Sequence, residues 1–152
     1  MKNNKLLLFK WIAVFMVLLL CGARSYAQNE FYDIYVYDVL KGTYHQVSSI
    51  ANHGEYNPSW SPNSKKIAHE AVSNEDWSQM IYVTDVETGV STLLIGAEQG
   101  NDAAWSPNGN NIMFDVWDGI MNWGKIYCVP AEGGEKTLLW DGGLNAEWSP
   151  NS

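Results

Sequence analysis

The sequence predicts an all-β fold made of repeated four-stranded antiparallel sheets, and three observations lead to that prediction. A Trp-Ser-Pro-Asn segment begins at Trp60, Trp105 and Trp148, so the intervals are 45 and 43 residues. An Ile-Tyr segment recurs in the same register and starts 21 residues after the tryptophan in both complete copies. A glycine and then an aliphatic residue follow each Ile-Tyr segment at constant distances. Fixed spacing of this kind indicates one structural unit repeated along the chain.

Each unit is expected to contain four short strands. The first strand ends at the tryptophan, and the following Ser-Pro-Asn step predicts a tight turn because proline fixes φ at its second position. The second strand contains Ile67 or Ile112, and the third is the Ile-Tyr segment, which is rich in β-branched and aromatic residues. A turn that contains glycine leads to the fourth strand, which ends in Val47, Leu94 or Leu139.

The third strand is apolar on both faces, since Ile81 and Val83 lie on one face and Tyr82 on the other. A sheet that is buried on both faces must lie between other sheets. Four-stranded sheets stacked face to face, with a period of about 40–45 residues, are the blades of a β-propeller. We therefore predict a partial β-propeller with about two and a half blades present.

The predicted organisation follows from the repeat register. Residues 28–152 form an incomplete propeller with a half blade at 31–48, blades at 56–95 and 102–140, and the start of a further blade at 146–152. Closed propellers typically contain four to eight blades. We therefore expect the sequence to be a fragment of a longer protein, and a ring assembled from several chains is the alternative.

The first 27 residues are typical of a secretory signal peptide. Three lysines precede an apolar stretch at 11–21, and the small residues Ser25 and Ala27 stand at the minus-three and minus-one positions of a cleavage site. The apolar stretch is shorter than the roughly 20 residues that a membrane span needs. We therefore predict cleavage after Ala27 and a periplasmic or secreted mature chain that does not span the membrane. Lipidation at Cys21 is the alternative.

The charge balance is acidic, with a formal net charge of −8. The segment 1–27 contains four of the nine basic residues and none of the 17 acidic ones, so its removal leaves a net charge near −12. An acidic surface repels phosphate backbones, which disfavours nucleic acid as a partner and suits a basic protein partner or a cation. Cys128 is the one cysteine after Ala27, so the mature chain has no internal disulfide and no cysteine cluster for zinc.

The repeat also resembles that of a known family. The pattern Pro/Ala-x-Trp-Ser-Pro-Asn-Gly, then Ile-Tyr-Val-x-Asp, then Gly, is similar to the WD-like propeller repeat of the TolB-like family over residues 31–152. That resemblance implies an exported β-propeller that mediates protein–protein or envelope interactions. Similar repeats occur in the propellers of prolyl-oligopeptidase-type peptidases and of some polysaccharide lyases. The family usually has aspartate where this chain has Asn63, Asn108 and Asn151.

Acidic and aromatic residues gather in the connections that one face of a propeller carries. Aromatic anchors contribute much of the free energy of binding at protein interfaces. We therefore predict a partner-binding face formed by Glu75, Asp76, Trp77, Trp117, Asp118 and Trp123. The sequence has no calcium-loop spacing, and we predict no metal site and no cofactor. The repeated residues Trp60, Trp105, Trp148, Tyr35, Tyr82 and Tyr127 are expected to pack between neighbouring blades.

The sequence favours a non-catalytic scaffold. It has no Gly-x-Ser-x-Gly elbow of the kind that positions a hydrolase nucleophile. The alternative is the propeller portion of a larger exported enzyme, a peptidase or a polysaccharide lyase, whose catalytic residues lie outside this chain. His69 is the one residue that the sequence offers to lyase chemistry.

Overall fold

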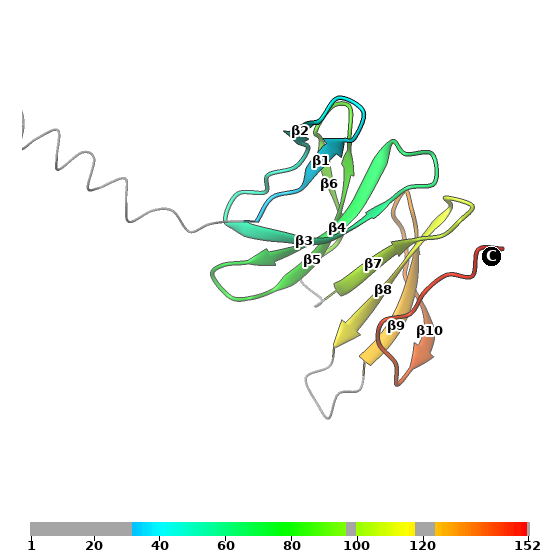
Figure 1. Ribbon diagram of the computed structural model, residues 1–152. Helices are drawn as coiled ribbons and strands as arrows, with labels where there is room; N and C mark the ends of the chain where they lie inside the picture. The colour runs from blue at the N-terminus through cyan, green and yellow to red at the C-terminus, as the bar shows by residue number, and fades with distance from the viewer. Residues whose placement is uncertain (1–31, 97–99, 118–123, 152) are drawn as a thin grey trace, which may run out of the picture. The chain divides into compact units, whose positions relative to one another are not determined.

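The computed structural model describes residues 32–96, 100–117 and 124–151 (Figure 1). The signal peptide predicted at 1–27 lies outside these ranges, as do Asp118 and Trp123 of the predicted binding face. Every regular element within the described ranges is a β-strand, which confirms the predicted all-β class.

The strands form three antiparallel sheets. The first sheet pairs β1 (Tyr35–Asp38) with β2 (Thr43–Gln46). The second sheet has the order β3-β4-β5-β6, with bounds His53–Trp60, Lys66–Ser73, Gln79–Asp85 and Ser91–Ile95. The third sheet has the order β7-β8-β9-β10, with bounds Gly100–Trp105, Asn111–Trp117, Gly124–Pro130 and Thr137–Asp141. One two-stranded and two four-stranded sheets confirm a partial β-propeller of about two and a half blades.

The Ser-Pro-Asn turns join the first and second strands of both four-stranded sheets. In the second sheet, Ser61 Oγ donates to Asn63 Oδ1 at 2.9 Å and accepts the Lys66 N–H at 2.9 Å. Ser106 Oγ donates to Asn108 Oδ1 at the same distance in the third sheet. The hydroxyl thus bridges both ends of the turn, which explains why serine precedes proline in each copy.

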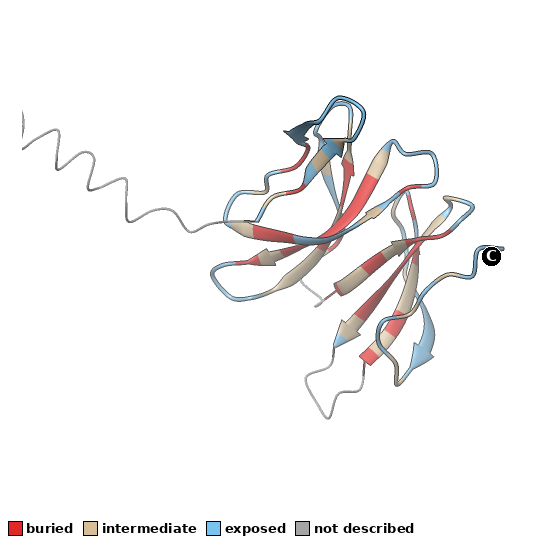
Figure 2. Cartoon of the chain, viewed as in Figure 1, coloured by how far each residue is buried: buried red, intermediate tan, exposed pale blue. Residues whose placement is uncertain are grey.

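The main core lies between the second and third sheets, where buried segments of facing strands meet (Figure 2). The second sheet contributes Ala68, Ile81, Val83 and Ile95, and the third contributes Ala103, Trp105, Ile112, Phe114, Val129 and Ala131. A smaller cluster of Ile34, Val47 and Ile67 joins the two-stranded sheet to the second sheet. Each sheet is therefore stabilised by the apolar area that its neighbour covers.

The three repeat tryptophans occupy different environments, so the prediction that all of them pack between blades was wrong for one. Trp105 is buried in the main core, and Trp148 is half-buried and donates its indole N–H to Ala104 O at 3.0 Å. Trp60, in contrast, is 46% exposed. The sheet next to Trp60 is β1–β2, which corresponds to the two outer strands of a blade and offers no inner strand against this indole.

The repeated tyrosines divide in the same way. Tyr82 and Tyr127 are half-buried, and their rings stack on His69 and Phe114 at centroid distances of 6.2 and 5.8 Å. Tyr35 is 53% exposed because it lies on the outer face of the two-stranded sheet, so the prediction of an interblade position was wrong for this residue.

Candidate binding face

The β4–β5 connection carries three of the predicted site residues, and hydrogen bonds fix its conformation. Ser73 Oγ accepts the backbone N–H groups of Glu75 at 3.2 Å and Asp76 at 3.4 Å. The N–H of Trp77 donates to Ser73 O at 3.1 Å. Asp76 Oδ1 accepts the Ser78 N–H at 3.0 Å, and hydrogen bonds from Ser78 and Ser73 lower the pKa of Asp76 to about 2. The connection is therefore an ordered turn that ends in a charged carboxylate.

Trp77 stands out in this turn. Its side chain is 75% exposed, and its backbone has a φ of 61°. Positive φ is unfavourable for a bulky residue and persists only where the surrounding structure imposes it. Burial does not explain the indole here, because most of it faces solvent. The turn therefore presents a large aromatic side chain from a backbone that hydrogen bonds hold in place.

A groove of about 250 Å³ lies close to this connection. It is lined by Asn57, Glu70, Gln79, Asn101, Asp102, Asp115, Trp117, Leu144 and Asn145. Trp117, which is 46% exposed, is the predicted site residue in its wall. Glu75, Asp76 and Trp77 do not line it, but Gln79, which begins β5 directly after their connection, does.

The groove is lined in part by residues from one position that recurs in each repeat. Asn57, Asp102 and Asn145 each precede the repeat tryptophan by three residues and have φ values of 49°, 47° and 55°. The first two lie at register shifts in the pairing of β3 with β4 and of β7 with β8. Asparagine and aspartate tolerate the left-handed region better than other side chains, which accounts for their presence at these bulges.

Two buried acids link one repeat to the next at these bulges. Glu70 Oε1 accepts the backbone N–H of Asp102, and Asp115 Oδ2 accepts the backbone N–H of Asn145. Asn57 Nδ2 also donates to Glu70 Oε1 at 2.9 Å and to Asp102 Oδ1 at 3.1 Å. Each acid stands ten residues after the repeat tryptophan, so the contact is part of the repeat itself.

The electrostatics of the groove are negative. Glu70 and Asp115 are 4% and 2% exposed, and burial raises the pKa of both carboxyl groups. The charge of Asp102 raises both pKa values further, while hydrogen bonds from Asn57 and from backbone amides oppose the shift. None of the described residues that line the groove is basic. The groove therefore offers hydrogen-bond acceptors and an aromatic wall, a combination that suits a basic group.

Sequence reasoning missed part of this groove. Asn57, Glu70 and Asp102 were not predicted as site residues, although their constant distances from the repeat tryptophans were visible in the sequence. Asp118 and Trp123, which were predicted, lie outside the described residues.

Within 32–96, 100–117 and 124–151, no group of three or more His, Cys, Asp or Glu residues is placed to hold a metal ion. No helix in those ranges is long and apolar enough to cross a membrane. His69 is fully buried, so its imidazole does not reach a surface where a polysaccharide could bind.

No family model and no curated protein matches this chain. Among solved structures, a putative TolB from Agrobacterium tumefaciens is 24% identical with a TM-score of 0.69, over 82% of this chain and 44% of that one. TolB from Acinetobacter baumannii is 26% identical with a TM-score of 0.57, over 70% of this chain and 26% of that one. The described chain has a TolB-like β-propeller fold.

The same fold comparison includes an enzyme. An oligogalacturonate lyase from Vibrio parahaemolyticus is 11% identical with a TM-score of 0.57, over 72% of this chain and 30% of that one. This identity shows a shared fold alone. The chain spans less than half the length of each of these three solved chains.

Proposed function

We propose that this TolB-like chain is part of an exported binding scaffold that recruits a protein or envelope partner. The observation that carries the proposal is the 75% exposed indole of Trp77 in an ordered turn, two residues before Gln79 in the wall of the groove that also contains Trp117. Solvent-exposed tryptophans in ordered turns make effective anchors because little conformational freedom is lost when they are buried. Glu75 and Asp76 directly precede the anchor in the sequence. Asp118 and Trp123, which the sequence predicts for the same face, lie outside the described residues.

The chemistry of the groove points to a basic partner segment. A lysine or arginine side chain would meet the carboxylates of Glu70, Asp102 and Asp115 and could stack on the indole of Trp117. The acidic net charge of −8 acts in the same direction by steering a basic surface toward the chain. Such an interaction would weaken as salt increases, because salt screens exposed charges over about 10 Å at 0.1 M.

The proposed location is the periplasm or the cell exterior. It rests on the signal peptide predicted at 1–27 and on the likeness to TolB structures.

The double variant Trp77→Ala/Trp117→Ala tests the proposal. Losing two exposed anchors should reduce the share of the chain found in partner complexes, on native gels of solubilised envelopes, by at least about tenfold, since a single hot-spot residue contributes about 2 kcal/mol or more. Val90→Ala is the matched control, because Val90 is 60% exposed in the β5–β6 turn at the opposite end of the sheet. Complexes that persist in the double variant at wild-type levels would rule out this face.

A further inference from the structure

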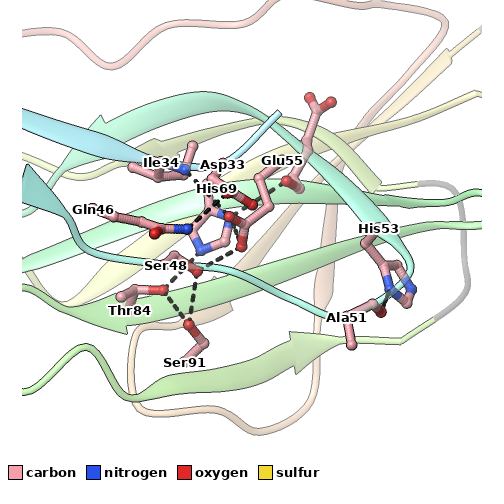
Figure 3. Close-up of polar contacts among 11 residues, drawn as sticks. Asp33, Ile34, Gln46, Ser48, Ala51, His53, Glu55, His69, Thr84 and Ser91 are labelled. Atoms are coloured by element: carbon pink, nitrogen blue, oxygen red, sulfur yellow. Dashed lines mark hydrogen bonds and ion pairs between the residues drawn. The ribbon is translucent and has the colours of Figure 1, made fainter. Parts of the chain in front are cut away.

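A cluster of five polar side chains, four of them buried and the fifth, Ser91, half-buried, lies where the two-stranded sheet packs on the second sheet (Figure 3). It consists of Ser48, Glu55, His69, Thr84 and Ser91. The side chains of Glu55 and His69 are both 0% exposed. Buried polar and ionisable groups cost free energy unless every hydrogen-bonding atom has a partner. Packing alone therefore does not explain the presence of this polar cluster.

The repeat shows that this interface does not have to be polar. The next interface lies between the second and third sheets. The residues there that correspond to Ser48, Glu55, His69, Thr84 and Ser91 are, in that order, Ile95, Gly100, Phe114, Val129 and Lys136. Phe114 and Val129 are fully buried there. The polar set is thus specific to one interface, and the apolar alternative is compatible with the same fold.

The five groups form a continuous chain of hydrogen bonds that begins at Glu55 and ends at His69. Glu55 Oε1 lies 2.5 Å from Ser48 Oγ, and Ser48 Oγ lies 2.9 Å from Ser91 Oγ. Ser91 Oγ lies 2.7 Å from Thr84 Oγ1, which lies 2.8 Å from His69 Nε2. The chain nearly closes on itself, because His69 Nδ1 lies 3.8 Å from Glu55 Oε1.

The hydrogen-bonded series from Glu55 to His69 has a fixed number of hydrogen atoms to share among its contacts. The four contacts along it need one hydrogen each, and His69 Nδ1 needs another to donate to Glu70 O at 3.3 Å. Three hydroxyl groups and a neutral imidazole supply four hydrogens for these five contacts. An ionised Glu55 beside a neutral His69 therefore leaves one contact without a hydrogen. One additional proton, on either Glu55 or His69, satisfies all five.

We propose that Glu55 and His69 together form a buried single-proton site, occupied at neutral pH, that holds the two-stranded sheet against the second sheet. With the proton on Glu55, the carboxyl O–H donates to Ser48, and each hydroxyl donates to the next group until Thr84 donates to His69 Nε2. With the proton on His69, every donation along the chain is reversed. Both arrangements use the same atoms, and the proton moves from one to the other without any change in the heavy-atom positions.

The surroundings favour the arrangement with the proton on Glu55. Burial raises the pKa of Glu55, the Asp33 carboxylate raises it further, and hydrogen bonds from Ser48 and from the Ile34 N–H oppose the shift. Burial lowers the pKa of His69 to about 4.

Among the residues that the structure describes, the other groups facing the pair add no compensating cation. They are the Glu70 carbonyl on β4, the Tyr82 ring on β5, and the hydroxyls of Ser48 and Ser91. Gln46 on β2 donates to Asp33 Oδ2 at 2.7 Å, and His53 on β3 points its Nδ1 at Ala51 O.

The site makes stability depend on pH in a defined direction. In the unfolded chain the glutamate and the histidine titrate near their ordinary values of about 4.5 and 6.5. Between these two pKa values the folded and the unfolded state each hold one proton on the pair, so the contribution of the pair to stability does not change with pH. Above about pH 6.5 the unfolded state holds none. The proposed proton stays on the folded pair above that pH, so stability from the pair is lost as the pH rises further.

Nuclear magnetic resonance on the isotopically labelled full chain at pH 7 reports the protonation states of Glu55 and His69 directly. We expect the Glu55 carboxyl carbon at the chemical shift of a protonated acid and His69 as a neutral ring with its hydrogen on Nδ1. An ionised Glu55 beside a doubly protonated His69 also holds one proton and supports the proposal. An ionised Glu55 beside a neutral His69, or a doubly protonated pair, would overturn it.

The variant Glu55→Gln tests for the same proton through the number of protons released on unfolding. In Glu55→Gln the amide supplies the missing hydrogen permanently. Unfolding in urea at pH 7.5 should therefore release one proton fewer per molecule than unfolding of the wild type. The matched control is Glu87→Gln, an exposed change that should release as many protons as the wild type. Equal release from Glu55→Gln and the wild type would contradict the proposal, and the resonance measurement decides the matter if Glu55→Gln does not fold.

Discussion

Trp77 combines a strained backbone with an exposed side chain, and neither feature helps the chain to fold. Its φ of 61° is held by the hydrogen bonds of the Ser73–Ser78 turn, while three quarters of the side chain faces solvent. Most strained residues in folded proteins lie at functional positions, where the rest of the structure supports them. Trp77 is therefore a stronger candidate for a functional role than the better-buried tryptophans of the repeat.

The strain at Trp77 can be measured. Trp77→Gly should unfold at a higher urea concentration than Trp77→Ala, because glycine adopts positive φ without steric cost and alanine does not. We expect a difference of about 1 kcal/mol in the free energy of unfolding between the two variants. Equal stability of the two would show that the turn relaxes and that the indole position is not fixed.

At the scale of the element, the second strand of each four-stranded sheet carries an acid that reaches the next repeat. Glu70 on β4 and Asp115 on β8 accept backbone N–H groups from Asp102 and Asn145. The Asp102 N–H sits in the bulge of β7 and Asn145 lies outside the described strands, so neither N–H has a ladder partner. The acids thus complete the hydrogen bonding of the neighbouring inner strand and fix where the groove opens.

Removing one of these acids should destabilise the chain. In Glu70→Ala the half-buried N–H of Asp102 loses its acceptor, and an unsatisfied buried group costs about 1–3 kcal/mol. The exposed amide of Asn57 loses one of its two acceptors. Glu75→Ala removes an exposed carboxylate and should change the free energy of unfolding by less than about 0.5 kcal/mol. Urea denaturation of both variants provides the comparison, and a Glu70→Ala protein as stable as Glu75→Ala would refute the linking role.

At the scale of the whole molecule, the two interfaces between sheets differ in chemistry. The second and third sheets meet through an apolar core that includes Phe114 and Val129. The interface of the two-stranded sheet with the second combines a small apolar cluster with the buried pair Glu55 and His69. Hydrophobic contact tolerates a wide range of pH, whereas a buried proton does not. We therefore expect the attachment of the two-stranded sheet to depend on the protonation of the Glu55–His69 pair.

The sequence predicted the architecture because the repeat encodes it. Turn residues such as Pro62 and strand residues such as Ile81 recur in register, and each recurrence fixes one element. Details that depend on which neighbour is present could not be predicted in this way. The exposure of Trp60 follows from a two-stranded neighbour, and the partnership of Glu55 with His69 joins residues of two strands. The repeat register did contain the position of Glu70, but its contact with the next repeat appears only in three dimensions.

We propose that the face formed by the β4–β5 connection and the groove binds a partner. Site-specific photocrosslinking in the source cells tests it most directly, with the reactive residue at position 77 and, as control, at position 88. Thr88 is exposed in the β5–β6 turn, at the opposite end of the same sheet. The account predicts a discrete adduct from position 77 that weakens as salt rises and is absent from position 88. Adducts of equal intensity from both positions, or none from position 77, would contradict it.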